Sequence, residues 1–302
     1  MTPGGAERAQ RRGGAERAQC HGGGESPELP LVVAHRGASA EQPEHTLAAY
    51  ELALRHGADA LECDVRLTRD GHLVCVHDRR VDRTSTGRGV VSGMTLQGLG
   101  RLDFGSWHDP FPATADELID PYERGEDPSA EQPATPAGLL TLSALLELVV
   151  AHGGGARLFA ETKHPVRYGG LVEAKLVAEL HRFGLARPRT ADAARVVMMS
   201  FSARAVWRVR RSAPRVPTVL LGRNCAALAG VPGTTAGATA IGPSIAALRA
   251  DPELVARASA QGRDTYTWTV DTPGDAAVCR ELGVRWVATN HPRSMRGWLS
   301  AA

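Results

Sequence analysis

The chain has no hydrophobic run long enough to cross a membrane. Its longest apolar stretches are residues 31–34 and 144–151, and Glu147 interrupts the second. A membrane-spanning helix needs about 20 apolar residues. We therefore expect no stable membrane insertion.

Aromatic residues and charge of a single sign are also scarce. Aromatics make up 5% of the 302 residues, and the formal net charge is +2. Proteins that bind nucleic acid usually present a strongly basic face or aromatic stacking platforms. The composition therefore argues against a nucleic-acid partner.

Cysteine is sparse and irregularly spaced. The five cysteines are odd in number, and no two have C-x-x-C spacing. This pattern disfavours a disulfide framework and a cysteine-based zinc site, and it favours reduced thiols in a cytoplasmic protein.

Residues 1–29 differ from the rest of the chain. They are rich in Gly, Arg, Ala and Glu, and the sequence GGAERAQ at residues 4–10 recurs at 13–19. The segment has too few apolar residues to offset the entropy of ordering, and it lacks the apolar core of a secretory signal. We expect a disordered tail followed by one domain at 30–302, the alternative being a start site assigned too far upstream.

Within that domain, short β-branched runs alternate with segments of helical period. The predicted strands are residues 31–34, 58–67, 73–77, 157–161, 195–201, 217–221, 239–241, 264–269 and 285–289. The predicted helices are residues 46–56, 142–152, 170–183, 203–211, 245–261 and 273–282. Such alternation indicates βαβ units and a parallel sheet.

The second and third predicted strands are separated only by a turn at Asp70-Gly71, a strong hairpin signal. We interpret the third strand as an antiparallel arm after strand 2. The other eight form an α/β fold, a (β/α)8 TIM barrel. A Pro-rich inserted loop at about 103–140 interrupts the rhythm.

Acidic residues alternate along the second strand. Glu62 and Asp64 share one face of an otherwise apolar run, and side chains on one strand face lie close together. Two buried like charges need a counter-cation, and an oxygen-only pair suits Mg²⁺ or Ca²⁺. Glu161, at the end of the fourth strand, is a candidate third ligand.

Two histidines are candidates for acid–base catalysis. A two-residue hairpin loop would place His77 directly opposite Asp64. The carboxylates there raise its proton affinity and a metal bound to them opposes that gain, so we expect the imidazole to titrate near neutral pH. His35 ends the first strand, and strand ends line the active site of such barrels.

Other polar residues occur at the same predicted end of the barrel. Arg36 and Lys163 are candidates for binding a phosphate. Glu44 lies before a helix that Thr46 can cap. Trp268 either packs against substrate carbons or belongs to the core.

These motifs together resemble the glycerophosphodiester phosphodiesterases. The blocks that carry the resemblance are Val33-Ala34-His35-Arg36-Gly37, Pro43-Glu44-His45-Thr46, Glu62-Cys63-Asp64-Val65, Thr68-Arg69-Asp70-Gly71, Val76-His77-Asp78, Asp82-Arg83-Thr84-Ser85, Glu161-Thr162-Lys163, Ser200-Phe201, Trp268-Thr269-Val270 and Thr289-Asn290-His291-Pro292. Each block is weak alone, but the ordered set is specific and covers about residues 31–298.

The resemblance implies a metal-dependent barrel that hydrolyses glycerophosphodiesters, such as glycerophosphocholine or glycerophosphoethanolamine, to glycerol 3-phosphate and an alcohol. It implies metal ligands at Glu62, Asp64 and Glu161, catalytic histidines at His35 and His77, and phosphate contacts near Arg36 and Lys163. Glu44 falls in the family's active-site glutamate block, and Trp268, a candidate for substrate binding, in a later family block. The insertion at about 103–140 would cover the glycerol side.

Two departures from the family pattern stand out: His45 replaces a usual Asn, and Asn290 a frequent Asp. The alternatives are a phospholipase D-type enzyme acting on lysophospholipid or sphingomyelin headgroups, a metal-free phospholipase C and a non-catalytic binding barrel. The sequence leaves open whether water or the glycerol hydroxyl attacks, which histidine acts first as the acid, and the oligomeric state.

Overall fold

A computed structural model describes residues 29–108, 138–153, 155–224 and 236–301. The predicted tail up to residue 28 and residues 109–137 of the predicted insertion lie outside the described residues.

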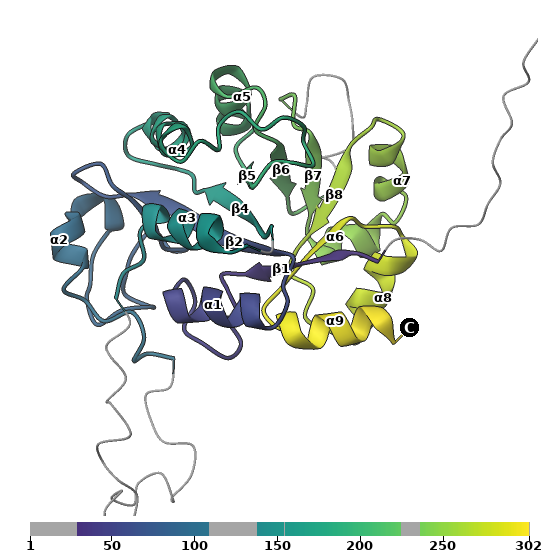
Figure 1. Cartoon of the computed structure of the whole chain (residues 1–302), viewed down its shortest axis with the longest axis horizontal. Coiled ribbons are helices and arrows are strands. Elements are labelled where there is room, and N and C mark those ends of the chain that lie inside the picture. The colour runs from purple at the N-terminus through teal and green to yellow at the C-terminus, as the bar shows by residue number, and fades with distance from the viewer. Residues whose placement is uncertain (1–28, 109–137, 154, 225–235, 302) are drawn as a thin grey trace, which may run out of the picture.

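Eight parallel strands close into a barrel, which confirms the predicted (β/α)8 class (Figure 1). Closure is made by β1, which pairs with β2 on one side and with β9 on the other. The barrel strands are β1 (Leu31–His35), β2 (Ala60–Leu67), β4 (Arg157–Thr162), β5 (Val196–Ser200), β6 (Thr218–Gly222), β7 (Ala240–Pro243), β8 (Asp264–Thr267) and β9 (Trp286–Thr289).

Helices surround the barrel, and the short α2 lies to one side of it (Figure 1). The helices are α1 (Leu47–Arg55), α2 (Leu96–Leu99), α3 (Leu142–Ala151), α4 (Leu171–Arg182), α5 (Ala203–Ser212), α6 (Ile245–Ala250), α7 (Leu254–Ser259), α8 (Pro273–Glu281) and α9 (Pro292–Ser300), with a 3-10 turn η1 (Val91–Gly93).

The prediction of one helix over residues 245–261 is wrong, because α6 and α7 are separate. Pro252 lies between them, where it lacks an N–H and restricts the residue before it. The predicted cap of α1 is confirmed, since the Thr46 hydroxyl accepts a hydrogen bond from the Ala49 amide at 3.2 Å.

The packing of β2 shows which side chains point into the barrel. Leu61, Cys63 and Val65 belong to the apolar layer shared with the surrounding helices, whereas Ala60 joins the cluster inside the barrel. Because side chains alternate along a strand, Glu62 and Asp64 lie on the inward side.

Strand β3 (Leu73–Cys75) runs antiparallel to the end of β2, with Leu67 opposite Leu73. The predicted two-residue loop is wrong. The Thr68 amide donates to the His72 carbonyl at 2.9 Å, so the loop has three residues and ends on Gly71 at φ +85°. A left-handed glycine in the last loop position is typical of three-residue hairpins.

This register changes the neighbour of Asp64. The Val76 amide, and not the residue after it, bonds to the Asp64 carbonyl at 2.9 Å. The prediction that His77 faces Asp64 directly across the hairpin is therefore wrong.

No helix in the described part of the chain is both long and apolar enough to span a membrane.

Candidate active site

Three buried carboxylates converge at one end of the barrel. Asp64 and Glu161 are register partners on adjacent strands, and Glu62 lies two residues before Asp64. One oxygen from each of Glu62, Asp64 and Glu161 lies within 4.8 Å of the other two. The sequence prediction that these acids come together is confirmed.

The basic side chains near the three acids do not supply enough positive charge for all three carboxylates to be ionised at once. Burial and the neighbouring Asp64 raise the pKa of Glu62 well above its usual value. Burial and Asp64 likewise raise the pKa of Glu161 to about 7. A compact set of oxygen donors that resists ionisation without a cation fits a hard divalent metal ion.

Asp64 differs because basic side chains surround it. Burial opposes its charge, but Lys163 and His45 outweigh burial and hold the pKa of Asp64 well below its usual range. Lys163 Nζ lies 2.9 Å from Asp64 Oδ1 and 3.0 Å from Glu161 Oε2. Arg36 Nε lies 3.1 Å from Asp64 Oδ2.

A tight turn after β1 positions Arg36. Arg36 and Gly37 have φ of +59° and +88°, and a Cβ on Gly37 would lie 2.7 Å from the Ala49 carbonyl carbon. Only glycine therefore allows this approach to α1. The turn directs the Arg36 amide to Glu62 Oε2 at 3.1 Å.

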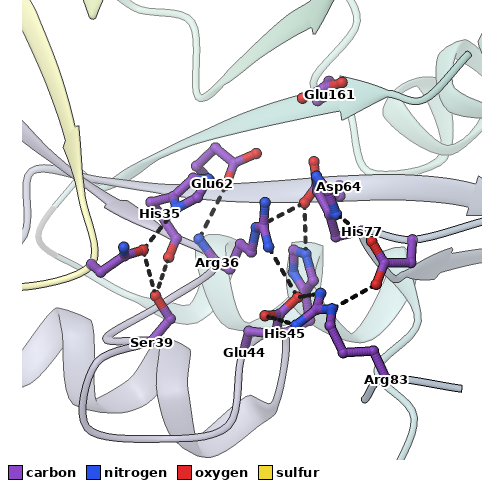
Figure 2. A network of polar contacts seen from close by, with 12 residues as sticks. His35, Arg36, Ser39, Glu44, His45, Glu62, Asp64, His77, Arg83 and Glu161 are labelled. Atoms are coloured by element: carbon purple, nitrogen blue, oxygen red, sulfur yellow. Dashed lines mark hydrogen bonds and ion pairs between the residues drawn. The ribbon is translucent and has the colours of Figure 1, made fainter. Parts of the chain in front are cut away.

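The side-chain amide of Asn290 holds the His35 ring, and Ser39 lies beside His35 (Figure 2). Its Nδ1 lies 2.8 Å from Asn290 Oδ1, which also accepts from the Ser39 hydroxyl at 2.8 Å. Asn290 Nδ2 donates to Asp271 at 2.6 Å. Since that carboxylate only accepts, the amide oxygen must face His35, so Nδ1 carries the proton and Nε2 is free to accept one.

Burial, together with the charge of Arg36, keeps His35 neutral. Burial first, and then the charge of Arg36, lower the pKa of His35 to about 4. The imidazole is therefore unprotonated at neutral pH, as a general base requires.

His77 lies beyond β3, next to a carboxylate. Its Nδ1 lies 2.8 Å from Asp78 Oδ1, and Asp78 also accepts from Arg83. Burial lowers the pKa of His77, and the charge of Asp64 opposes this shift. Asp78 nevertheless orients the ring and stabilises its charged form.

His45, the first departure from the family pattern, contacts the acid cluster. Its Nε2 lies 3.0 Å from Asp64 Oδ2, and its Nδ1 lies 2.8 Å from the Tyr50 hydroxyl. Its φ is +61°, a left-handed conformation in which Asn and His are both enriched. The backbone conformation thus accommodates either residue.

Glu44 lies outside the acid cluster and pairs with two arginines. Arg36 Nη1 and Arg83 Nη2 approach Glu44 Oε1 at 3.1 and 2.8 Å. Burial alone would raise the pKa of Glu44, but the hydrogen bonds from Arg83 and the charge of Arg36 bring it to about 2. Glu44 therefore orients Arg36.

The two histidines, Arg36, Lys163, Glu62 and Glu161 line one cleft of about 60 Å³. Its lining includes His35, His77 and Lys163 on one side and Phe201, Arg223 and Trp268 on the other. The Trp268 indole donates to the Gly242 carbonyl at 2.9 Å and is half-buried.

A larger cavity, of about 430 Å³, lies beside η1 and the segment after β4. None of the predicted site residues lines it, so size does not identify the site in this molecule.

The sequence interpretation missed several polar contacts of the site. Asp271 and Ser39 lie in none of the motifs, and Arg83 lies in a motif to which no role was assigned. Their contacts with Asn290 and Glu44 reveal their roles. Arg223 also lies in no motif, and only its place in the lining of the cleft points to a role.

Comparison with known proteins identifies a family. The model of the Glycerophosphoryl diester phosphodiesterase family matches residues 35–294. A "Probable glycerophosphodiester phosphodiesterase 1" from Mycobacterium tuberculosis is 56% identical over 270 residues, covering 89% of this chain and 92% of that one. A glycerophosphodiester phosphodiesterase from Bacillus subtilis is 34% identical over 275 residues, covering 88% and 85%.

Solved structures show the same fold. A glycerophosphodiester phosphodiesterase from Agrobacterium tumefaciens matches with a TM-score of 0.66 at 25% identity, covering 91% of this chain and 100% of that one. A phosphodiesterase from Oleispira antarctica, solved with its product sn-glycerol-3-phosphate, has a TM-score of 0.70 at 21% identity, covering 90% and 97%.

The fold and site thus define a phosphodiesterase built on a parallel barrel. The chain belongs to the glycerophosphodiester phosphodiesterase family.

Proposed function

We propose that this enzyme hydrolyses water-soluble glycerophosphodiesters to glycerol 3-phosphate and an alcohol, with a divalent metal ion held by Glu62, Asp64 and Glu161. The observation that carries the proposal is the convergence of this acid cluster with His35, His77, Arg36 and Lys163 at one end of the barrel.

A phosphodiester carries one negative charge on its non-bridging oxygens. Arg36 and Lys163 line the cleft and offer N–H donors to those oxygens. When bound, Mg²⁺ or Ca²⁺ would supply Lewis-acid stabilisation of the charge that develops on phosphorus oxygens. The two basic side chains stabilise the same charge and hold the phosphate for in-line attack.

The two imidazoles divide the proton transfers. His35 Nε2 is the free acceptor, because Asn290 holds Nδ1 as the donor, and it takes the proton from the attacking hydroxyl. His77, whose ring Asp78 orients through Nδ1, gives a proton to the departing alcohol oxygen. Different environments for two titratable groups are the usual way to separate a base from an acid.

The attacking oxygen belongs to water or to the glycerol hydroxyl next to the phosphate. Water gives glycerol 3-phosphate in one step. The hydroxyl gives a cyclic phosphate, which water then opens with the histidines in exchanged roles.

The experiment is an activity screen on purified protein. Glycerophosphocholine, glycerophosphoethanolamine and lysophosphatidylcholine are incubated with the protein, with its EDTA-treated form, and after Mg²⁺ or Ca²⁺ is added back. We expect release of glycerol 3-phosphate that EDTA abolishes and one of the metals restores. Turnover of lysophosphatidylcholine alone would instead support the phospholipase D-type alternative, and activity unaffected by EDTA would refute the metal site.

A further inference from the structure

The cleft has a second wall that the proposed chemistry does not use. Phe201, Arg223 and Trp268 follow β5, β6 and β8, across the barrel from the acids of β2. They line the same cleft as the two histidines. An organic group bonded to phosphorus that extends across the barrel therefore meets these three side chains.

Two of the three side chains are aromatic and partly accessible. The Phe201 and Trp268 rings meet edge to face, with centroids 5.3 Å apart and planes at 87°. Phe201 is 39% exposed. Exposed aromatic faces attract ammonium groups, including quaternary ones, so this pair alone would favour an alcohol such as choline.

Arg223 works against an alcohol that carries an ammonium group. Its guanidinium carbon lies 5.8 Å from the centroid of the Phe201 ring, so a cation of the protein's own already covers the aromatic face. The side chain is exposed, and its guanidinium forms no ion pair with any carboxylate that the structure describes. The positive charge is therefore available to a ligand in the cleft.

We propose that Arg223 makes the enzyme favour glycerophosphodiesters whose alcohol is neutral or anionic over those whose alcohol carries an ammonium group. An ammonium group in the cleft is repelled by the positive charge of Arg223, and it cannot pack on the Phe201 ring because the guanidinium already covers that face. Hydroxyl and carboxylate oxygens instead accept hydrogen bonds from the guanidinium fork. This inference rests on the proposed function, and it concerns the alcohol because the glycerol half is the same in every such substrate.

The test compares kcat/KM for glycerophosphoinositol, whose alcohol is a neutral polyol, with that for glycerophosphocholine. The variants are Arg223→Met, which removes the charge, and Arg223→Lys, which keeps it. The matched control is Arg211→Met, because Arg211 also lies over a ring, 4.8 Å from the Trp207 centroid, but does not line the cleft.

The wild type should prefer the inositol substrate. Arg223→Met should shift the ratio toward choline by about three- to fivefold, as expected for removing one solvent-exposed charge interaction. Arg211→Met should keep the wild-type ratio. Arg223→Lys should stay closer to the wild-type ratio than Arg223→Met does, because it keeps the charge and loses only the guanidinium fork. Added salt should reduce the preference of the wild type.

Two results overturn the inference alone. One is an unchanged ratio in Arg223→Met, and the other is an equal loss on both substrates, which would place Arg223 on the shared glycerophosphate. A wild-type protein that hydrolyses neither substrate overturns the proposed function, and the inference with it. Melting temperatures of all variants show whether the fold is kept.

Discussion

Asn290 Oδ1 accepts from His35 Nδ1 at 2.8 Å, and this contact determines which ring nitrogen faces the cleft as a base. The amide is itself held by Asp271, which accepts from Asn290 Nδ2 at 2.6 Å and from the Asn290 backbone amide at 2.8 Å. The Asn at position 290, a departure from the family pattern, is therefore complemented by a nearby carboxylate.

Removal of the Asp271 carboxylate should lower kcat, although Asp271 itself does not contact the substrate. In Asp271→Ala the amide is free to rotate and present Nδ2 to His35, which favours the wrong tautomer. We expect kcat to fall by about tenfold, less than the roughly 10²- to 10⁴-fold contribution of an acid–base group, because the imidazole itself stays in place, and we expect little change in KM. Asp264→Ala, which removes an exposed carboxylate at the start of β8, is the control. Equal kcat in the two variants would contradict the orienting role of Asp271.

Loss of either imidazole should be more severe. His35→Ala and His77→Ala should each lower kcat by about 10²- to 10⁴-fold, because each transfers a proton in the proposed reaction. Both residues are at least partly exposed to the cleft, so the far-ultraviolet circular dichroism should not change. A fully active double variant would rule out both assignments.

The acid cluster should couple metal binding to stability. In the wild type, Mg²⁺ or Ca²⁺ should relieve repulsion among Glu62, Asp64 and Glu161, and binding to the folded state should raise the melting temperature. The double variant Glu62→Gln, Asp64→Asn should lose this rise and the metal-dependent activity while keeping its circular dichroism. A metal-induced rise that persists in the double variant would place the cation elsewhere.

Glu44 should make stability depend on pH in the acid range. Its folded pKa of about 2 lies below the ordinary value of 4.5. The unfolded chain thus takes up the proton first, and the stability that Glu44 contributes is complete above about pH 4.5 and is lost as pH falls toward 2. The contribution is about 2 kcal/mol after allowance for solvent screening around the half-exposed Arg83.

The measurement is the free energy of unfolding of wild type and Glu44→Gln at several pH values between 3 and 6. The difference between the two proteins should shrink as the pH falls. A difference that stays constant over that range would show that the charge of Glu44 does not contribute in this way.

The barrel and the acid cluster were predictable because each follows from a local pattern. Glu62 and Asp64 alternate within an apolar strand, and Glu161 ends another, so closure of the sheet brings them together whatever the loops do. The cap at Thr46 likewise needs only its neighbours within one turn of helix.

Other features depend on details that a pattern does not carry. The hairpin register changes with one residue of loop length, and Gly71 permits the three-residue form. The contacts of Glu44 with Arg83 and of Asn290 with Asp271 join segments far apart in the chain or separated by a helix. Such pairs become visible only when the barrel places them side by side.

A crystal structure of the protein with Mn²⁺ and glycerol 3-phosphate would test the metal and phosphate sites together. We expect an anomalous peak bonded to Glu62, Asp64 and Glu161, with the phosphate within hydrogen-bond distance of His35, His77, Arg36 and Lys163. A metal peak away from these acids, or a phosphate that reaches neither histidine, would contradict the proposed sites.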